Sequence, residues 1–316
     1  MTFSKGNNAE IDVGRIGFGC APVMSRVGRL KSMALIDRAV SLGIRYFDTA
    51  DSYGFGGSET LLGEMLESLR NRILISTKVG TAYSAQMRKL QWLKPLVRPI
   101  INRFQRAKQV VSNTVSSQTT YGVFERTHLQ AALVGSLRRL RTDCIDLYLL
   151  HNPSVDVLKR GIPFEFLERA KKEGKIRAYG VSCGSTEEGL AATECAGVSA
   201  IQIEVNWKDY SAVEKLLPSA SQKGIAIIAR APFANGAIFA PDFTVPVTVP
   251  PDLEGSKRRT FLARAAIQSI ASLPGVSMVL GTMMSLDHLE ANVSAARSLQ
   301  DGVHFPRSVS GTQLPE

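Results

Sequence analysis

Asp48 and Tyr53 are the residues whose types and spacing most directly suggest chemistry. They lie in the stretch FDTADSYG, residues 47–54, which follows the short apolar run at residues 43–47. An Asp that closes a buried strand, with a Tyr five residues later on the following loop, places a carboxylate and a phenol in one pocket. A structural alternative stays open at this point, in which Asp48 caps the helix that starts near Ser58 and Tyr53 is a half-buried loop aromatic.

Short β-branched runs alternate with longer helical patterns along the 316 residues. The predicted strands are 15–19, 44–48, 73–78, 145–151, 176–182, 200–204, 224–230 and 276–280. The predicted helices are 32–42, 58–69, 126–140, 163–173, 186–196, 211–223, 257–272 and 286–299. Strands that are apolar on both faces and joined by helices indicate a parallel α/β sheet.

Closure of this sheet into a (β/α)8 TIM barrel is the economical solution for a series of eight strand–helix units. The runner-up is an open doubly wound sheet, but the sequence at residues 17–22 stops after two glycines and does not complete a Gly-x-Gly-x-x-Gly fingerprint. We therefore expect a single barrel domain over residues 1–316 with long loops after the third and seventh strands. Residues 79–124 are too long for an ordinary connection and are predicted to form an inserted, partly helical basic flap. Residues 231–255 are predicted to be a loop, and residues 301–316 a C-terminal tail.

The net charge of +10 raises the hypothesis of a nucleic-acid partner. Much of the excess lies in residues 84–110, a segment without Asp or Glu. Its aromatic residues are few, mainly Trp92 and Phe104, and it matches no binding module, so we expect no nucleic acid partner and interpret the segment as solvated surface.

The composition, 44% hydrophobic and 21% charged, is ordinary for a soluble globular protein. No run is long enough to span a membrane, and the first residues lack the apolar segment of a signal peptide. The expected location is therefore cytoplasmic. The four cysteines show no paired metal-ligand spacing, so we expect free thiols and no metal centre.

Three polar residues close successive predicted strands: Asp48, Lys78 and His151. Because the carboxyl ends of barrel strands form one site, these side chains should converge, with Tyr53 reaching over them. A buried ammonium beside a phenol lowers the pKa of the phenol, and Asp48 is expected to hold Lys78 charged. With His151 donating to a carbonyl oxygen, such a set suits proton transfer to that oxygen while hydride reaches its carbon.

The sequence resembles the aldo-keto reductase family over nearly its whole length. The motifs that carry the resemblance are Gly17-Phe18-Gly19, residues 43–54 with Ser58-Glu59 and Leu62-Gly63, Ser76-Thr77-Lys78, residues 136–140 leading into 146–151, residues 179–182, Gln202 with Asn206, and Gly281-Thr282 ahead of His288-Leu289 and Asn292. The resemblance implies a barrel that binds a nicotinamide cofactor without a Rossmann fold. It also implies a small carbonyl or alcohol substrate, with reduction of aldehydes or ketones or the reverse oxidation.

Carried over by position, the resemblance implies that Tyr53 is the general acid/base of a tetrad completed by Asp48, Lys78 and His151. It implies that Ser182 and Gln202 hold the carboxamide of the nicotinamide. The other cofactor-binding positions that it implies are Gly19, Cys20, Asp48, Cys183, Arg230, Pro232, Gly281, Thr282, His288 and Asn292.

Several positions depart from the family pattern. Arg230 stands where many relatives carry a Tyr stacked on the nicotinamide, and two hypotheses follow: it favours the reduced cofactor, or it contacts cofactor phosphate. Cys183 replaces an Asn that provides one carboxamide hydrogen bond. Residues 282–288 lack the Lys and Arg that hold the 2′-phosphate in many relatives. We expect NADP(H) over NAD(H), with NAD(H) as the alternative.

A second function stays open, because the potassium-channel β subunits also resemble this family: a non-catalytic subunit that senses a nicotinamide cofactor. The residues expected to line a substrate pocket are Phe55, Tyr83, Trp92, Asn152, Trp207 and Phe233. Neither the substrate nor the oligomeric state follows from these residues.

Overall fold

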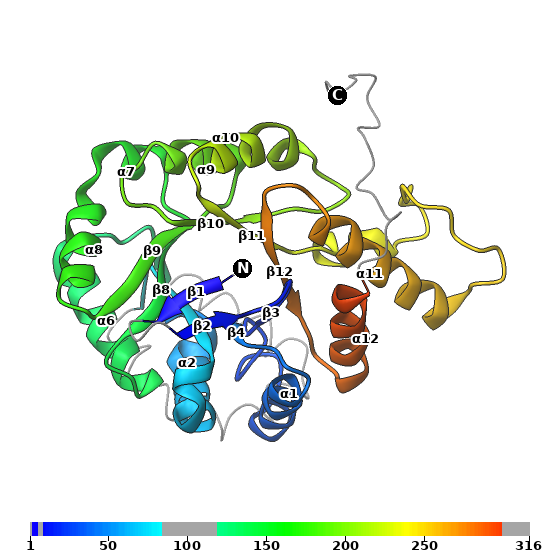
Figure 1. Ribbon diagram of the computed structural model, residues 1–316, viewed down its shortest axis with the longest axis horizontal. Helices are drawn as coiled ribbons and strands as arrows, with labels where there is room; N and C mark the ends of the chain where they lie inside the picture. Colours follow the sequence, from blue (N-terminus) through cyan, green and yellow to red (C-terminus); the bar gives the residue numbers. More distant parts are fainter. Residues whose placement is uncertain (1, 6–8, 84–118, 299–316) are drawn as a thin grey trace.

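The computed structural model describes residues 2–5, 9–83 and 119–298, and its centre is a closed barrel of eight parallel strands (Figure 1). In order around the ring these are β3 (Ile16–Gly19), β4 (Tyr46–Asp48), β5 (Leu74–Val79), β8 (Ile145–His151), β9 (Ile176–Ser182), β10 (Ala200–Glu204), β11 (Ala226–Arg230) and β12 (Val276–Thr282). The last strand pairs with the first, from Val279 opposite Ile16 to Thr282 opposite Gly19. The predicted (β/α)8 barrel is confirmed, and the open doubly wound sheet is excluded because the described barrel has no edge strand.

Helices surround the barrel and cover the outer faces of its strands (Figure 1). They are α1 (Arg29–Ser41), α2 (Gly57–Leu66), α6 (Arg126–Leu140), α7 (Val155–Arg160), α8 (Ile162–Lys172), α9 (Thr186–Thr193), α10 (Leu217–Gln222), α11 (Gly255–Ala271) and α12 (Leu286–Arg297). A π-helical turn, η4 (Ala212–Leu216), precedes α10, and a 3-10 turn, η2 (Glu67–Arg72), follows α2.

One helix, α7, was not predicted. Its N-cap is Ser154, whose hydroxyl accepts from the backbone N–H of Val157, and its C-cap is Gly161 in the left-handed conformation. Six residues are too few to show a helical period in the sequence. Among the described helices, none combines the length and the apolar character that crossing a bilayer requires.

The strand side chains separate into two apolar layers because successive residues point to opposite faces. Outward-facing residues pack against the helices in the larger core, whereas inward-facing residues fill the barrel. The inner set includes Tyr46, Leu74, Leu147, Ile228 and Met278.

An antiparallel hairpin of β1 (Thr2–Lys5) and β2 (Ala9–Asp12) lies across the ring (Figure 1). Ile11 and Val13 pack against inner residues near the strand starts, such as Leu74 and Leu147. The hairpin therefore closes the amino-terminal end of the barrel and leaves the carboxyl end as the open mouth. It was not predicted, since two strands of four residues give little pattern.

The two long loops predicted from the sequence follow β5 and β11 in the structure. After β5 the chain forms an antiparallel ribbon of β6 (Thr81–Tyr83) and β7 (Thr119–Tyr121), which brings the two ends of the basic flap together. Residues 84–118 of that flap, with Trp92 and Phe104, and the tail at 301–316 lie outside the described residues.

The loop after β11 begins with a short 3-10 segment, η5 (Ala234–Phe239), and packs on the barrel through its own apolar cluster. Trp207, with 4% of its surface exposed, lies in this cluster and donates through Nε1 to the Ser269 hydroxyl at 3.0 Å. The role of Trp207 in a substrate pocket stays a prediction, and in the structure its ring packs in this apolar cluster. The alternation of Phe243, Val245, Val247 and Val249 supplies partners for this cluster and was a signal for it in the sequence.

Candidate active site

Asp48, Tyr53, Lys78 and His151, here called the tetrad, come together at the carboxyl end of the barrel. Lys78 Nζ lies 2.6 Å from Asp48 Oδ2 and 3.5 Å from the Tyr53 hydroxyl. The rings of Tyr53 and His151 are 6.2 Å apart between centroids and meet edge to face at 86°. Alternation along β4, β5 and β8 turns the three strand-end side chains inward, so the four groups surround one point of the mouth.

Lys78 is the most enclosed member, with 1% of its surface exposed. Its ammonium donates to Asp48, to the Thr49 carbonyl oxygen at 2.9 Å and toward the Tyr53 hydroxyl. Burial by itself lowers the pKa of Lys78, but the carboxylate of Asp48 and the phenol of Tyr53 outweigh it, and the net pKa is raised. Lys78 is therefore a buried cation at neutral pH, with all three donors directed at acceptors.

Both carboxylate oxygens of Asp48 accept hydrogen bonds. Oδ2 accepts from Lys78, and Oδ1 accepts from the Ser76 hydroxyl at 2.7 Å and from Gln202 Nε2 at 2.8 Å. The structural alternative, in which Asp48 caps a helix, is wrong: the residue before α2 is Gly56, and no side chain caps that helix.

Ser76 and Gln202 are thus partners of Asp48, and neither contact was predicted. Ser76 was not predicted as a site residue, whereas Gln202 was predicted to hold the carboxamide of a nicotinamide. Ser76 stands two residues before Lys78 on β5, so the alternation of a strand was a signal that both side chains share a face. Gln202 also connects Asp48 to Ser182, because its Oε1 accepts a hydrogen bond from the Ser182 hydroxyl at 3.0 Å. No local pattern reveals the contact of Gln202 with Asp48.

Tyr53 opens a tight 3-10 turn, η1 (Tyr53–Gly56), in which Gly54, Phe55 and Gly56 all have positive φ. A Cβ on Gly54 would lie 3.0 Å from the Cβ of Met24, so glycine lets the preceding loop pack against this turn. Phe55 adopts φ 59° without that freedom, and such strain persists only where surrounding structure fixes the backbone.

The turn is anchored on α2 by a buried charge. Glu59 is fully buried, accepts from the Thr77 hydroxyl at 2.6 Å and pairs with Arg139 of α6 at 2.6 Å. Asp51 lies nearby with Oδ1 enclosed and unpartnered within the described part of the chain. Burial, reinforced by the charge of Glu59, raises the pKa of Asp51 well above its usual range.

His151 is neutral at physiological pH. Burial first, and then the positive charges of Lys78 and Arg230, lower its pKa to about 3. Its Nδ1 is enclosed and has no hydrogen-bond partner among residues 2–5, 9–83 and 119–298. A neutral imidazole carries one N–H donor, which suits a hydrogen bond to a substrate oxygen rather than a full proton transfer.

The other residues predicted to bind a cofactor lie at or near strand ends, except for two on α12. Gly19 ends β3, and the Cys20 amide donates to the Asp48 carbonyl at 2.8 Å. Gly281 and Thr282 end the adjacent β12, and Pro232 follows β11. Asn292 is buried on α12, with its amide nitrogen beside Gly281, whereas His288 stands in the first turn of α12.

Arg230 is the last residue of β11, and its guanidinium group has two partners. Its Nη1 lies 2.6 Å from Glu204 Oε1, and its Nη2 donates to the Cys183 carbonyl at 2.9 Å. The thiol of Cys183 is buried, which raises its pKa and leaves it protonated. Glu204 was not predicted as a site residue.

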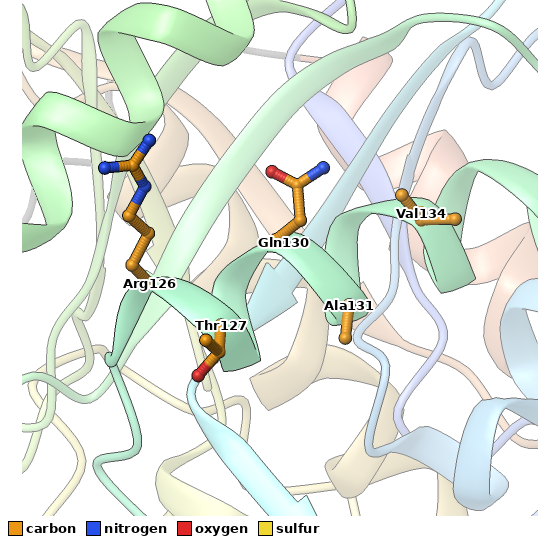
Figure 2. A pocket seen from close by; sticks show the side chains of 5 residues that line it. All are labelled: Arg126, Thr127, Gln130, Ala131 and Val134. Atoms are coloured by element: carbon orange, nitrogen blue, oxygen red, sulfur yellow. The ribbon is translucent and has the colours of Figure 1, made fainter.

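A hollow elsewhere on the surface does not belong to this site. Arg126, Thr127, Gln130, Ala131 and Val134 line it, and all five come from the solvent-facing side of α6 (Figure 2). The tetrad, in contrast, faces the barrel interior. Within the described residues, no group of three or more His, Cys, Asp or Glu side chains is placed to hold a metal ion.

Comparisons with known proteins agree with this architecture. The uncharacterized oxidoreductase YqkF of Bacillus subtilis is 27% identical over 239 residues, which are 75% of this chain and 67% of that protein. The solved holo form of an aldo-keto reductase from Bacillus halodurans superposes with a TM-score of 0.69 at 23% identity and covers 94% of this chain and 91% of its own. An aldo/keto reductase from Klebsiella pneumoniae, solved with NADP and acetate, gives 0.66 at 22% identity over 95% and 91%. These two solved structures share the fold.

The family comparison covers the tetrad and the strand ends around it. The model of the Aldo/keto reductase family matches residues 15–242, which include Asp48, Tyr53, Lys78, His151 and Arg230. The chain therefore belongs to the aldo/keto reductase family of oxidoreductases.

Proposed function

We propose that this protein reduces an aldehyde or ketone to an alcohol, or catalyses the reverse oxidation, with a nicotinamide cofactor and with Tyr53 as general acid/base. The observation that carries the proposal is the position of Lys78. Its ammonium is buried and lies between the Asp48 carboxylate at 2.6 Å and the Tyr53 hydroxyl at 3.5 Å. A fixed cation beside a phenol that faces an open mouth is suited to moving a proton at the phenolic oxygen.

The tetrad residues divide the work of one proton transfer. In the direction of reduction, Tyr53 gives its proton to the carbonyl oxygen while the carbonyl carbon accepts a hydride. Lys78 stabilises the negative charge that develops on the phenolic oxygen, and Asp48 keeps Lys78 in place. His151, neutral and facing Tyr53, donates a hydrogen bond to the substrate oxygen and orients the carbonyl.

The mouth of the barrel suits a nicotinamide, the group that would supply the hydride when bound. Gln202 uses one amide N–H on Asp48, which leaves its second N–H for a carboxamide. The Ser182 hydroxyl donates to Gln202 and keeps its lone pairs as acceptors.

We propose NADP(H) as the preferred cofactor. The Klebsiella pneumoniae structures, one with NADP and acetate and one with NADPH, support this preference by analogy. The segment at 282–288 that opens α12 carries no Lys or Arg, so a 2′-phosphate would lack charged partners there. We therefore expect NADPH to bind more tightly than NADH by less than about tenfold.

The test is turnover of a panel of small aldehydes and ketones with NADPH and with NADH. Tyr53→Phe should lower kcat/KM by about 10²–10⁴-fold, the range supplied by general acid–base catalysis, and should keep cofactor binding. Tyr148→Phe is the matched control, because Tyr148 points away from the barrel interior and its hydroxyl has no partner in the described residues. Full turnover in Tyr53→Phe would contradict the assigned role.

The same experiment distinguishes catalysis from the second candidate function. Tight cofactor binding without turnover on any carbonyl or alcohol would favour the non-catalytic cofactor-sensing subunit. All four tetrad side chains are in place, which favours catalysis, and turnover is the observation that discriminates between the two functions.

A further inference from the structure

The guanidinium group of Arg230 spans three neighbouring strand ends. Arg230 is directly opposite Glu204 in the β10–β11 register, and Cys183 is the first residue after β9. The bonds to Glu204 Oε1 at 2.6 Å and to the Cys183 carbonyl at 2.9 Å use the two terminal nitrogens of the group. Two partners, one on β10 and one directly after β9, fix the orientation of the planar guanidinium.

This plane lies beside the groups proposed to meet the nicotinamide. Glu204 follows Gln202 by two residues on the same face of β10, and Cys183 follows Ser182 directly. The positive charge of Arg230 also contributes to the lowered pKa of His151, at the end of β8. The Arg230 side chain keeps 27% of its surface exposed, so the described residues do not enclose it completely.

We propose that Glu204 is a positioning residue that holds the Arg230 guanidinium flat and offsets its charge, so that the cofactor ring can lie against it in either oxidation state. The inference rests on the proposed function. A guanidinium stacks well on a planar ring, but the oxidised nicotinamide is a cation and the reduced one is neutral. An uncompensated Arg230 would therefore repel only the oxidised form, and the Glu204 carboxylate removes most of that difference.

This inference revises the sequence-based hypothesis that Arg230 favours the reduced cofactor. That hypothesis treated Arg230 as a free cation, whereas the structure pairs it with Glu204. The pair as a whole carries no net charge. Discrimination between the two oxidation states should appear only when Glu204 loses its charge.

The test is equilibrium binding of the reduced and the oxidised cofactor to the full chain, measured by fluorescence titration and by calorimetric titration. The probes are NADPH and NADP⁺, or NADH and NAD⁺ if the wild type binds these more tightly. The variants are Glu204→Gln, Arg230→Met and the double variant, and Glu214→Gln, an exposed charge on η4, is the control for net charge. Glu204→Gln should weaken binding of the oxidised form about tenfold more than binding of the reduced form, because the pair is partly exposed and its field is screened.

The double variant identifies the cause. If Glu204 acts by offsetting the charge of Arg230, the ratio of the two dissociation constants in the double variant should equal the ratio in Arg230→Met. Equal weakening of both forms in Glu204→Gln, or a changed ratio that persists without Arg230, would overturn the inference and leave the proposed function intact. Failure of the wild type to bind either form would overturn the proposed function and the inference together.

Discussion

His151 provides the most quantitative prediction, because its pKa falls from the ordinary 6.5 to about 3 on folding. Replacement of His151 by Gln keeps a neutral polar side chain and removes the titration. Between pH 6.5 and pH 3 the unfolded chain binds a proton at this position and the folded protein does not, so stability falls as the pH falls. His151→Gln should therefore lose less folding stability than the wild type as the pH falls through this range.

The magnitude follows from the two pKa values. At pH 5 the unfolded imidazole is almost fully protonated and the folded one is not, which costs about 2 kcal/mol of folding free energy relative to pH 8. A folded pKa one unit higher would leave this value nearly unchanged, because pH 5 would still lie above it. The free energy of unfolding of the wild type should therefore fall by about 2 kcal/mol more than that of His151→Gln between pH 8 and pH 5.

Urea unfolding of both proteins at the two pH values measures this difference. A direct check is an NMR titration of imidazole groups, since the chain has four histidines and His151→Gln assigns the relevant signal. The His151 signal should stay unchanged from pH 8 to about pH 4. A midpoint near 6.5, or parallel stability profiles of the two proteins, would refute the description of His151 as a buried neutral donor.

Two further predictions concern the layer between the barrel and its helices. Folding raises the pKa of Asp51, mainly through burial and then through the charge of Glu59, so the wild type loses stability as the pH rises above about 4. Asp51→Asn should therefore unfold at a higher urea concentration than the wild type at pH 8, and this gain should shrink toward pH 4. An equal gain at both pH values would contradict this cause. A Cβ added at Gly63 of α2 would collide with the Arg139 carbonyl of α6. Gly63→Ala should therefore lower the free energy of unfolding by about 1–3 kcal/mol. An unchanged urea midpoint would show that the two helices can move apart without cost.

The sequence by itself determined the barrel and the positions of the tetrad. The alternation of apolar runs with helical patterns predicted each barrel strand to within a few residues. Asp48, Lys78 and His151 close their strands in the sequence, and a parallel barrel brings strand ends together whatever the loops do. The convergence of these side chains therefore depended only on local patterns and on closure of the sheet.

Only the tertiary structure decided which partners these groups have. Gln202 reaches Asp48 across 154 positions of the chain, and Glu204 pairs with Arg230 across 26, contacts that no local pattern encodes. Trp207 belongs to the core because the loop after β11 folds over it. The charge state of His151 likewise depends on burial and on cations from two other strands, Lys78 and Arg230, since electrostatic free energies are set by distance in space and by access of water rather than by separation along the chain.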